Sequence, residues 1–253
     1  MILLLDQDAW VRINKTCAGS YQSPINIAYP VKHNPRLYLK IEYTYPEDKE
    51  VIVENTGHTV QVSLSNDKHF QLTGSAANRD QFIFRQLHFH WGENDNDGAE
   101  HALFGQKYSG EAHFVFYNRK YRTFENAASQ PDGLTVLGVF LKATRENNFA
   151  LEPLISSLGS IRKEKSKSRA LFDMSKILPD RLNEFFRYSG SLTTPPCAEV
   201  VNWIVFSNPI PIGRNQLKKF RNVRDEDGAK LLSTWRSLQS LNNRLIEASF
   251  NPK

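Results

Sequence analysis

Long apolar runs, internal repeats and low-complexity tracts are all missing from this sequence. No segment approaches the roughly 18 consecutive apolar residues that a membrane-spanning helix needs, so we expect a soluble protein. No repeat of about 20 to 50 residues and no clear linker marks a boundary, so we expect one domain over residues 1–253. The composition, 40% hydrophobic and 23% charged, excludes collagen, coiled coil and gross disorder, and it supplies enough apolar residues for a sizeable core.

Cysteine is scarce, with only Cys17 and Cys197 in the chain. They allow one bridge at most, which would remove loop entropy worth roughly 5 kcal/mol from the unfolded chain in the chain-entropy model; two buried thiols are the alternative. Asn14 begins an Asn-Lys-Thr glycosylation sequon, which has meaning only in a secreted chain. Residues 1–5 resemble the start of a signal peptide but are shorter than its apolar region of about 7 to 15 residues. Together these features favour an extracellular protein.

Basic residues exceed acidic ones only modestly, for a net charge of +5. They concentrate only in residues 162–169, which have no interleaved aromatic residues and no groove-reading motif. We therefore expect a solvated loop there and no nucleic-acid partner. Contact of this segment with acidic polymers is the alternative.

The middle of the chain is rich in patterns typical of strands, with apolar and polar residues alternating. The candidate strands are residues 59–65, 82–91, 111–117, 134–143 and 200–206. Helical spacing is weaker, and the candidate helices are residues 151–158, 176–186 and 215–220. The expected fold is mainly β (α+β), with short peripheral helices.

Three histidines stand on two of these predicted strands. Because strand side chains alternate, His88 and His90 share one face with Gln86, and the apolar residues between them face the core. The same rule places Glu111 and His113 together on another strand. Three neutral imidazoles leave the fourth position of a tetrahedral zinc ion for water, which is the arrangement of a catalytic site. Gln86 and Glu111 stand where acceptors for the second ring N–H belong.

A His-x-His pair by itself is more often a pair of surface or hydrogen-bonded core histidines than a metal site. The second histidine-bearing strand is what favours a metal here. Imidazoles also bind copper, iron and nickel, but an all-imidazole set without sulfur favours Zn²⁺.

Several motifs, in their order and spacing, resemble those of the α-class carbonic anhydrases. They are residues 22–27 (QSPINI), 86–92 (QLHFHWG), 98–101 (GAEH), 111–113 (EAH), 191–196 (SLTTPP) and 243–246 (NRLI). The resemblance covers nearly the whole chain. It implies a single domain on a large, twisted, mostly antiparallel central sheet, with zinc at the bottom of a conical cleft. The implied reaction is the reversible hydration of carbon dioxide to bicarbonate and a proton.

The resemblance also implies roles for individual residues. His88, His90 and His113 match the zinc ligands, and Gln86 and Glu111 match the groups that hold them. Catalytic roles are implied for His58, Thr193 and Glu100. His58 matches the proton shuttle of fast members, a task that suits a group titrating near pH 6.5. Thr193 matches the residue whose hydroxyl contacts the zinc-bound hydroxide, and Glu100 matches the carboxylate that accepts from that hydroxyl.

A further set of positions matches the substrate pocket, where a small apolar molecule needs an apolar wall. The implied wall residues are Val115, Val136, Leu192, Val201 and Trp203. Thr194 matches a position near the bicarbonate product, and Gln61 an amide that orders the water in the cleft. Sulfonamides and small anions are the implied inhibitors.

Two further comparisons with the family concern the N-terminal region. Cys17 and Cys197 match the bridged pair typical of extracellular members. The family usually opens with a His-Trp-Gly-Tyr-like stretch followed by Gly-Pro before the tryptophan matched by Trp10, and residues 1–9 depart from that pattern. A tyrosine that helps to order the relay water is therefore missing. The resemblance implies the zinc chemistry for this chain, but it does not imply an efficient proton shuttle.

Two other classes of protein compete with this enzyme. A carbonic-anhydrase-like scaffold or matrix-binding module usually lacks at least one zinc histidine, and all three stand here. A zinc hydrolase of esters or peptides would be expected to carry a His-Glu-x-x-His motif or a carboxylate base beside the metal, and the sequence shows neither.

Overall fold

Strands dominate the computed structural model, which describes residues 7–44, 50–64 and 70–252. Thirteen of them form one sheet, and two short ones, β1 (Asn26–Ile27) and β8 (Ala102–Leu103), pair separately. The strands of the large sheet are β2 (Val31–His33), β3 (Lys40–Tyr43), β4 (Glu50–Asn55), β5 (Val60–Leu64), β6 (Phe70–Thr73), β7 (Phe82–Trp91), β9 (Gly110–Asn118), β10 (Leu134–Thr144), β11 (Lys167–Leu171), β12 (Phe185–Gly190), β13 (Val201–Phe206), β14 (Ile210–Gly213) and β15 (Ile246–Ala248).

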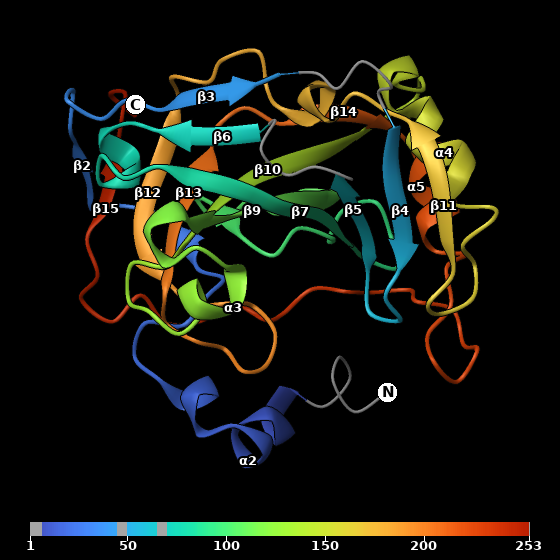
Figure 1. The fold of residues 1–253 in the computed structure, drawn as a ribbon, viewed down its shortest axis with the longest axis horizontal. Helices are drawn as coiled ribbons and strands as arrows, with labels where there is room; N and C mark the ends of the chain where they lie inside the picture. The colour runs from blue at the N-terminus through green and yellow to red at the C-terminus, as the bar shows by residue number, and fades with distance from the viewer. Residues whose placement is uncertain (1–6, 45–49, 65–69, 253) are drawn as a thin grey trace.

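The main path of the sheet runs β11-β4-β5-β7-β9-β10-β13-β12-β15-β2, and its twist is visible in Figure 1. Within the large sheet, as far as its strands are described, only the pairings of β10 with β13 and β14 and of β15 with β2 are parallel, and the separate pair β1 and β8 is parallel as well. The large, mostly antiparallel sheet of a single domain is thereby confirmed. Residue 65, the end of the first predicted strand, and the apolar residues 1–5 lie outside the described residues.

The helices are short and peripheral, as expected. They are α2 (Trp10–Ile13), α3 (Phe124–Ala127), α4 (Glu152–Ser157) and α5 (Arg214–Phe220). In Figure 1, α4 and α5 flank the β11 end of the sheet, and α2 lies below its body. The predicted helices at 151–158 and 215–220 are confirmed by α4 and α5. None of the described helices is both long enough and apolar enough to cross a membrane.

The predicted helix at residues 176–186 is wrong. A 3-10 turn, Met174–Ile177, ends at this point, and β12 begins at Phe185. The physical cause is Pro179, which cannot donate a backbone hydrogen bond and disfavours helical geometry in the preceding residue. Leu178 is accordingly extended, with φ −77° and ψ 142°.

The predicted loop at residues 162–169 is partly wrong, because its last three residues belong to the edge strand β11. Pairing of β11 with β4 places cations beside carboxylates: Lys167 lies 3.2 Å from Glu54, and Arg169 pairs with Glu50. Exposed ion pairs of this kind contribute little stability. These carboxylates do neutralise the charges of Lys167 and Arg169, which weakens the alternative that this segment attracts an acidic polymer.

A β-bulge in β7 sets the face on which His88 and His90 lie. Phe84 pairs with Phe116 but Gln86 pairs with Val115, so β7 holds one extra residue between these positions. The bulge reverses the alternation. Phe84 is buried in the same apolar cluster as Leu87, Phe89 and Trp91, and the side chains of Gln86, His88 and His90 point to the opposite face.

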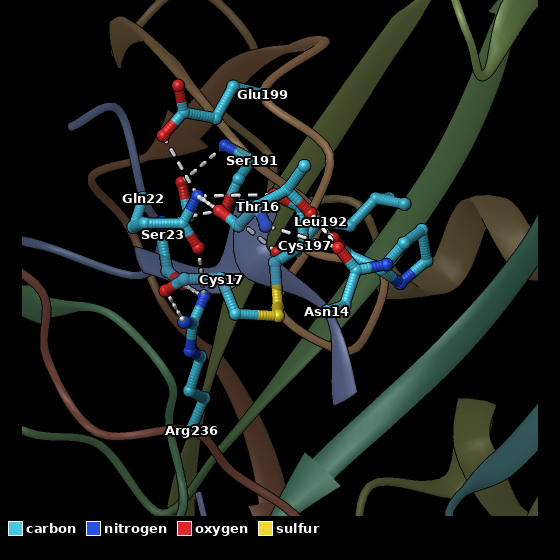
Figure 2. The surroundings of a disulfide bond; sticks show 11 residues. Asn14, Thr16, Cys17, Gln22, Ser23, Ser191, Leu192, Cys197, Glu199 and Arg236 are labelled. Atoms are coloured by element: carbon cyan, nitrogen blue, oxygen red, sulfur yellow. Dashed lines mark hydrogen bonds between the residues drawn. A yellow bond between two sulfur atoms is a disulfide. The ribbon is translucent and has the colours of Figure 1, made fainter. Parts of the chain in front are cut away.

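The disulfide between Cys17 and Cys197 joins the N-terminal segment to the loop that follows β12. Trp10 packs against the two cysteines in a small apolar cluster of its own. Figure 2 shows the bridge surrounded by hydrogen-bonded polar side chains, among them Gln22 and Ser191. The bridge predicted from the family resemblance is therefore present in the structure.

Candidate metal centre

Strand pairing brings the three predicted ligands together at the middle of the sheet. His88 on β7 lies directly opposite His113 on β9, and His90 lies opposite Glu111. The ring centroids of the three histidines are 4.6 to 5.1 Å apart. One ring nitrogen from each lies within 4.8 Å of the other two. This spacing suits one metal ion held by three imidazoles.

A hydrogen bond at the remaining ring nitrogen fixes the tautomer of each histidine. The three contacts are His88 Nδ1 to Gln86 Oε1 at 2.9 Å, His90 Nδ1 to the Thr234 carbonyl oxygen at 2.7 Å, and His113 Nε2 to Glu111 Oε1 at 2.9 Å. Since these oxygens accept, the three nitrogens carry the hydrogen. Lone pairs therefore remain on Nε2 of His88, Nε2 of His90 and Nδ1 of His113.

These lone pairs fit a divalent metal ion. Nε2 of His90 is buried and has no hydrogen-bond partner among the described residues, which is costly unless an ion binds there. Burial lowers the pKa of His90 to about 4, and burial likewise lowers the pKa of His88 and His113. The imidazoles are therefore neutral near pH 7, which is the form that binds a metal.

Glu111 is held from two sides. Its Oε1 accepts from His113 and, at 2.7 Å, from Nδ1 of His101, and its Oε2 accepts from the His101 backbone N–H at 2.8 Å. Burial acts to raise the pKa of Glu111, but the two histidines hold that pKa well below its usual range. A Cβ at Gly138 on β10 would lie 2.9 Å from Oε1. Glycine there leaves room for the carboxylate.

His101 is near enough to form a second cluster with Glu111 and His113, but both of its ring nitrogens are used. Nδ1 donates to Glu111, and Nε2 forms a 2.6 Å hydrogen bond with the hydroxyl of Tyr188, which also bonds Ser23 Oγ at 2.9 Å. No lone pair is left for a metal, so His101 supports the site and is not a ligand.

Glu100 and Thr193 lie beside the three histidines. Oε2 of Glu100 is 3.5 Å from Nε2 of His90 and 3.8 Å from Nδ1 of His113. Its Oε1 accepts the backbone N–H of Arg236 at 2.8 Å. Burial raises the pKa of Glu100, and a hydrogen bond from the side chain of Thr193 opposes that rise. Both side chains are buried.

A cavity of about 290 Å³ opens onto the metal centre. It is lined by His88 and His90 together with four other residues singled out from the sequence: His58, Gln61, Gln86 and Thr194. His58 is half-buried, and Thr194 is exposed at the rim. Gln61 on β5 pairs directly with His88. The structure thus brings a titratable side chain, His58, and three polar side chains into the same cleft as the predicted ligands His88 and His90.

The predicted apolar wall lies on neighbouring strands. Val136 on β10 pairs with Val115 on one side and with Trp203 on the other. These three residues and Val201 are buried in one apolar cluster, against which Leu192 packs. The ring centroid of Trp203 lies 4.8 Å from that of His113. The cluster adjoins the metal centre, but its residues are not among those that line the cavity.

Three supporting residues escaped the interpretation of the sequence. His101 stood inside the motif at residues 98–101, where its position beside Glu100 was the available signal. Tyr188 had no signal beyond its place on β12. Thr234 acts through a backbone carbonyl, an atom that every residue possesses, so no residue pattern could identify it.

Known proteins resemble this chain along almost its full length. A family model described as eukaryotic-type carbonic anhydrase matches residues 5–250. Carbonic anhydrase 1 of Monodelphis domestica is 36% identical over 249 residues, which cover 95% of this chain and 94% of the relative. Carbonic anhydrase 6 of Canis lupus familiaris is 36% identical over 254 residues, which cover 97% of this chain and 78% of the relative. Carbonic anhydrase 3 of Homo sapiens is 32% identical over 250 residues, covering 96% and 95%.

The matched region includes the three histidines, the carboxylates beside them and the disulfide. From its sequence and its site, the chain belongs to the eukaryotic-type carbonic anhydrase family, whose members are zinc-dependent carbonate dehydratases.

Proposed function

We propose that this enzyme hydrates carbon dioxide at the cavity beside His88 and His90, with these two residues and His113 holding a zinc ion. The convergence of three imidazole lone pairs, one of them buried without a partner, carries the proposal. Zinc bound by three histidines lowers the pKa of water to about 7, a value established for carbonic anhydrases themselves, and so supplies hydroxide at neutral pH.

The Thr193 side chain would orient the attacking hydroxide. When Thr193 donates its hydroxyl hydrogen to the Glu100 carboxylate, its oxygen has only lone pairs left. Thr193 would therefore accept a hydrogen bond from the attacking hydroxide and so direct a lone pair of the hydroxide toward the carbon of the substrate. The Thr193 backbone N–H would stabilise the negative charge that develops on the substrate oxygen.

The apolar cluster of Val115, Val136, Leu192, Val201 and Trp203 would offer carbon dioxide a surface without competing hydrogen bonds. At the rim, Thr194 would contact the bicarbonate product, and Gln61 would order the water of the cavity. Because the substrate is small and apolar, it would be bound by apolar contacts in a pocket that excludes water. The polar residues would contact the bicarbonate product and order the water that carries the proton.

His58 would carry the proton from the metal centre to solvent. His58 lines the same cavity as His88 and His90 and is half-buried, so it reaches both the site and bulk water. Histidine titrates near neutral pH and can therefore both accept and release a proton under working conditions.

For His58→Ala we expect maximal turnover in weak buffer to fall to on the order of 10³ s⁻¹. An acid of pKa near 7 loses its proton to water no faster than this when recombination is diffusion-limited at about 10¹⁰ M⁻¹ s⁻¹. Stopped-flow measurements should show kcat/KM unchanged and turnover restored by added imidazole buffer. Unchanged turnover in the variant would mean that His58 is not the relay in this chain.

The assignment as a whole is tested by stopped-flow carbon dioxide hydration on protein whose zinc content has been measured, with and without a sulfonamide. We expect one zinc ion per chain, rapid hydration and inhibition by the sulfonamide. A scaffold protein would lack hydration activity even with zinc bound. A hydrolase would cleave esters faster than it hydrates carbon dioxide.

The disulfide and the Asn14 sequon support a secreted protein. Asn14 caps a 3-10 turn, Lys15–Ala18, that carries Cys17, and Thr16 of the sequon is exposed. When the protein is expressed through a eukaryotic secretory pathway, we expect it to carry a glycan at Asn14 and to have no free thiol. Intact mass before and after glycosidase treatment and thiol alkylation measures both. An unmodified mass with two reactive thiols would contradict secretion.

A further inference from the structure

We propose that Arg236 is a positioning residue, which holds the metal ligand His90 and the carboxylate Glu100 in place by anchoring the backbone between residues 234 and 236 to the disulfide-bonded segment. The inference rests on the proposed zinc site and deepens it. It concerns a residue that contacts neither the metal ligands' free nitrogens nor the cavity.

Backbone atoms of the 234–236 segment hold two functional groups from different parts of the fold. The Thr234 carbonyl oxygen accepts from His90 Nδ1 at 2.7 Å, and the Arg236 N–H donates to Glu100 Oε1 at 2.8 Å. The first contact fixes which nitrogen of His90 faces the metal. The second holds the carboxylate that receives the Thr193 hydroxyl. The position of this short segment therefore sets the geometry of both.

No helix or strand contains the 234–236 segment. Thr234 joins it to the end of β7: its backbone N–H donates to the Trp91 carbonyl oxygen at 3.0 Å, and its side-chain Oγ1 accepts from the Trp91 N–H at 3.1 Å. Beyond that point the Gln7 side chain binds the Trp235 carbonyl oxygen and the Ser237 N–H, and the Arg236 side chain is the anchor toward the segment that carries Cys17. Only 4% of Arg236 is exposed. Its placement must therefore be secured by side-chain contacts and not by a regular hydrogen-bond ladder.

The Arg236 guanidinium binds the segment that carries Cys17. Nη1 donates to Gln22 Oε1 and to the Ser23 carbonyl oxygen, both at 2.9 Å, and Nη2 donates to the Cys17 carbonyl oxygen at 3.3 Å. The guanidinium carbon also lies 5.2 Å from the centre of the Trp10 ring. Figure 2 shows this side chain reaching the residues beside the disulfide. Acceptors on three residues match the fixed fork of arginine, which a single lysine ammonium cannot reproduce.

The disulfide links the same anchor to the catalytic loop. Cys17 is bonded to Cys197, whose backbone N–H donates to the Thr194 carbonyl oxygen at 2.8 Å. Thr194 directly follows Thr193. One anchored segment thus supports Glu100 through Arg236 and the Thr193 loop through the disulfide. Loss of the Arg236 side chain would release the first of these supports while the disulfide stays intact.

The decisive variant is Arg236→Met, which keeps an unbranched side chain about as long as the aliphatic stem of arginine and removes the guanidinium donors. We expect the zinc dissociation constant, measured by competition with a chelator, to rise about 10- to 100-fold, as it does when the partner of a metal-bound histidine is lost. We also expect kcat/KM to fall. Both are measured at a temperature where circular dichroism shows the variant fully folded.

Arg187→Met is the matched control. Arg187 also makes three side-chain hydrogen bonds, to Asn78, Asn202 and Glu247, but none of them reaches the 234–236 segment. It should lower the melting temperature and leave the zinc dissociation constant unchanged. Arg236→Lys can satisfy only part of the acceptor set, so its zinc affinity should lie between those of the wild type and Arg236→Met. If Arg236→Met does not fold, the zinc affinity of Arg236→Lys tests the inference in its place.

Wild-type zinc affinity and kcat/KM in a folded Arg236→Met, or in Arg236→Lys if only that variant folds, would overturn the inference. An equal loss of zinc affinity in Arg187→Met would also overturn the inference, because the loss would then reflect the lower stability of the protein and not the position of the 234–236 segment. Wild-type protein that binds no zinc would instead refute the proposed function, so the two failures are distinguishable.

Discussion

Replacing His88 with alanine is expected to release the zinc ion and abolish carbon dioxide hydration. Two imidazoles, from His90 and His113, cannot hold the ion tightly once the third is lost. We expect kcat/KM to fall by more than about 10³-fold, beyond the 10- to 100-fold that loss of an outer hydrogen-bond partner costs. Zinc content by atomic spectroscopy and stopped-flow hydration measure the two effects together.

His88 is the best of the three ligands for this test because it is the least buried. Its removal leaves only the neutral amide of Gln86 without a partner, whereas removal of His113 would deprive the buried Glu111 carboxylate of one of its donors. His33→Ala, at an exposed position on β2, is the control and should keep full zinc content and activity. Stoichiometric zinc with full activity in His88→Ala would refute the metal assignment.

Replacing Thr193 with alanine should lower kcat/KM by about 10²-fold while zinc remains bound. Without the hydroxyl, nothing forces the attacking hydroxide to point its lone pair at the substrate, and a misplacement of about 1 Å can cost that much. The zinc ligands are untouched, because Thr193 contacts Glu100 and not the protonated ring nitrogens. Stopped-flow kinetics on zinc-loaded protein provides the measurement.

Thr193→Ser is the matched comparison, since it keeps the hydroxyl and removes only a methyl group. We expect most of the activity to return in that variant. If Thr193→Ala is as active as wild type, orientation by the Thr193–Glu100 pair is not part of the mechanism here. If alanine and serine are equally impaired, packing of the methyl group matters more than the hydrogen bond.

Local patterns were sufficient where one element decides the outcome. The alternation around His88 and His90, and again around His113, placed ligands on one face of each strand, because side chains on a strand alternate by a geometric necessity. Prediction from local spacing failed at residues 176–186, where the spacing of apolar residues weakly favoured a helix and Pro179 prevents one. Short helices and loops are stabilised more by their surroundings than by their own residues.

The sequence by itself therefore determined the strands that carry the three histidines and, through the family motifs, the family of the chain, and it predicted the ligands and the chemistry that we propose. Only the tertiary structure decided which strands pair, where the β7 bulge lies, and that His90 is oriented by a carbonyl oxygen 144 residues away. It also decided that Arg236 reaches Cys17 across 219 residues. Backbone carbonyls and N–H groups are common to nearly all residues, so their pairing follows from topology and leaves no mark in the residue pattern.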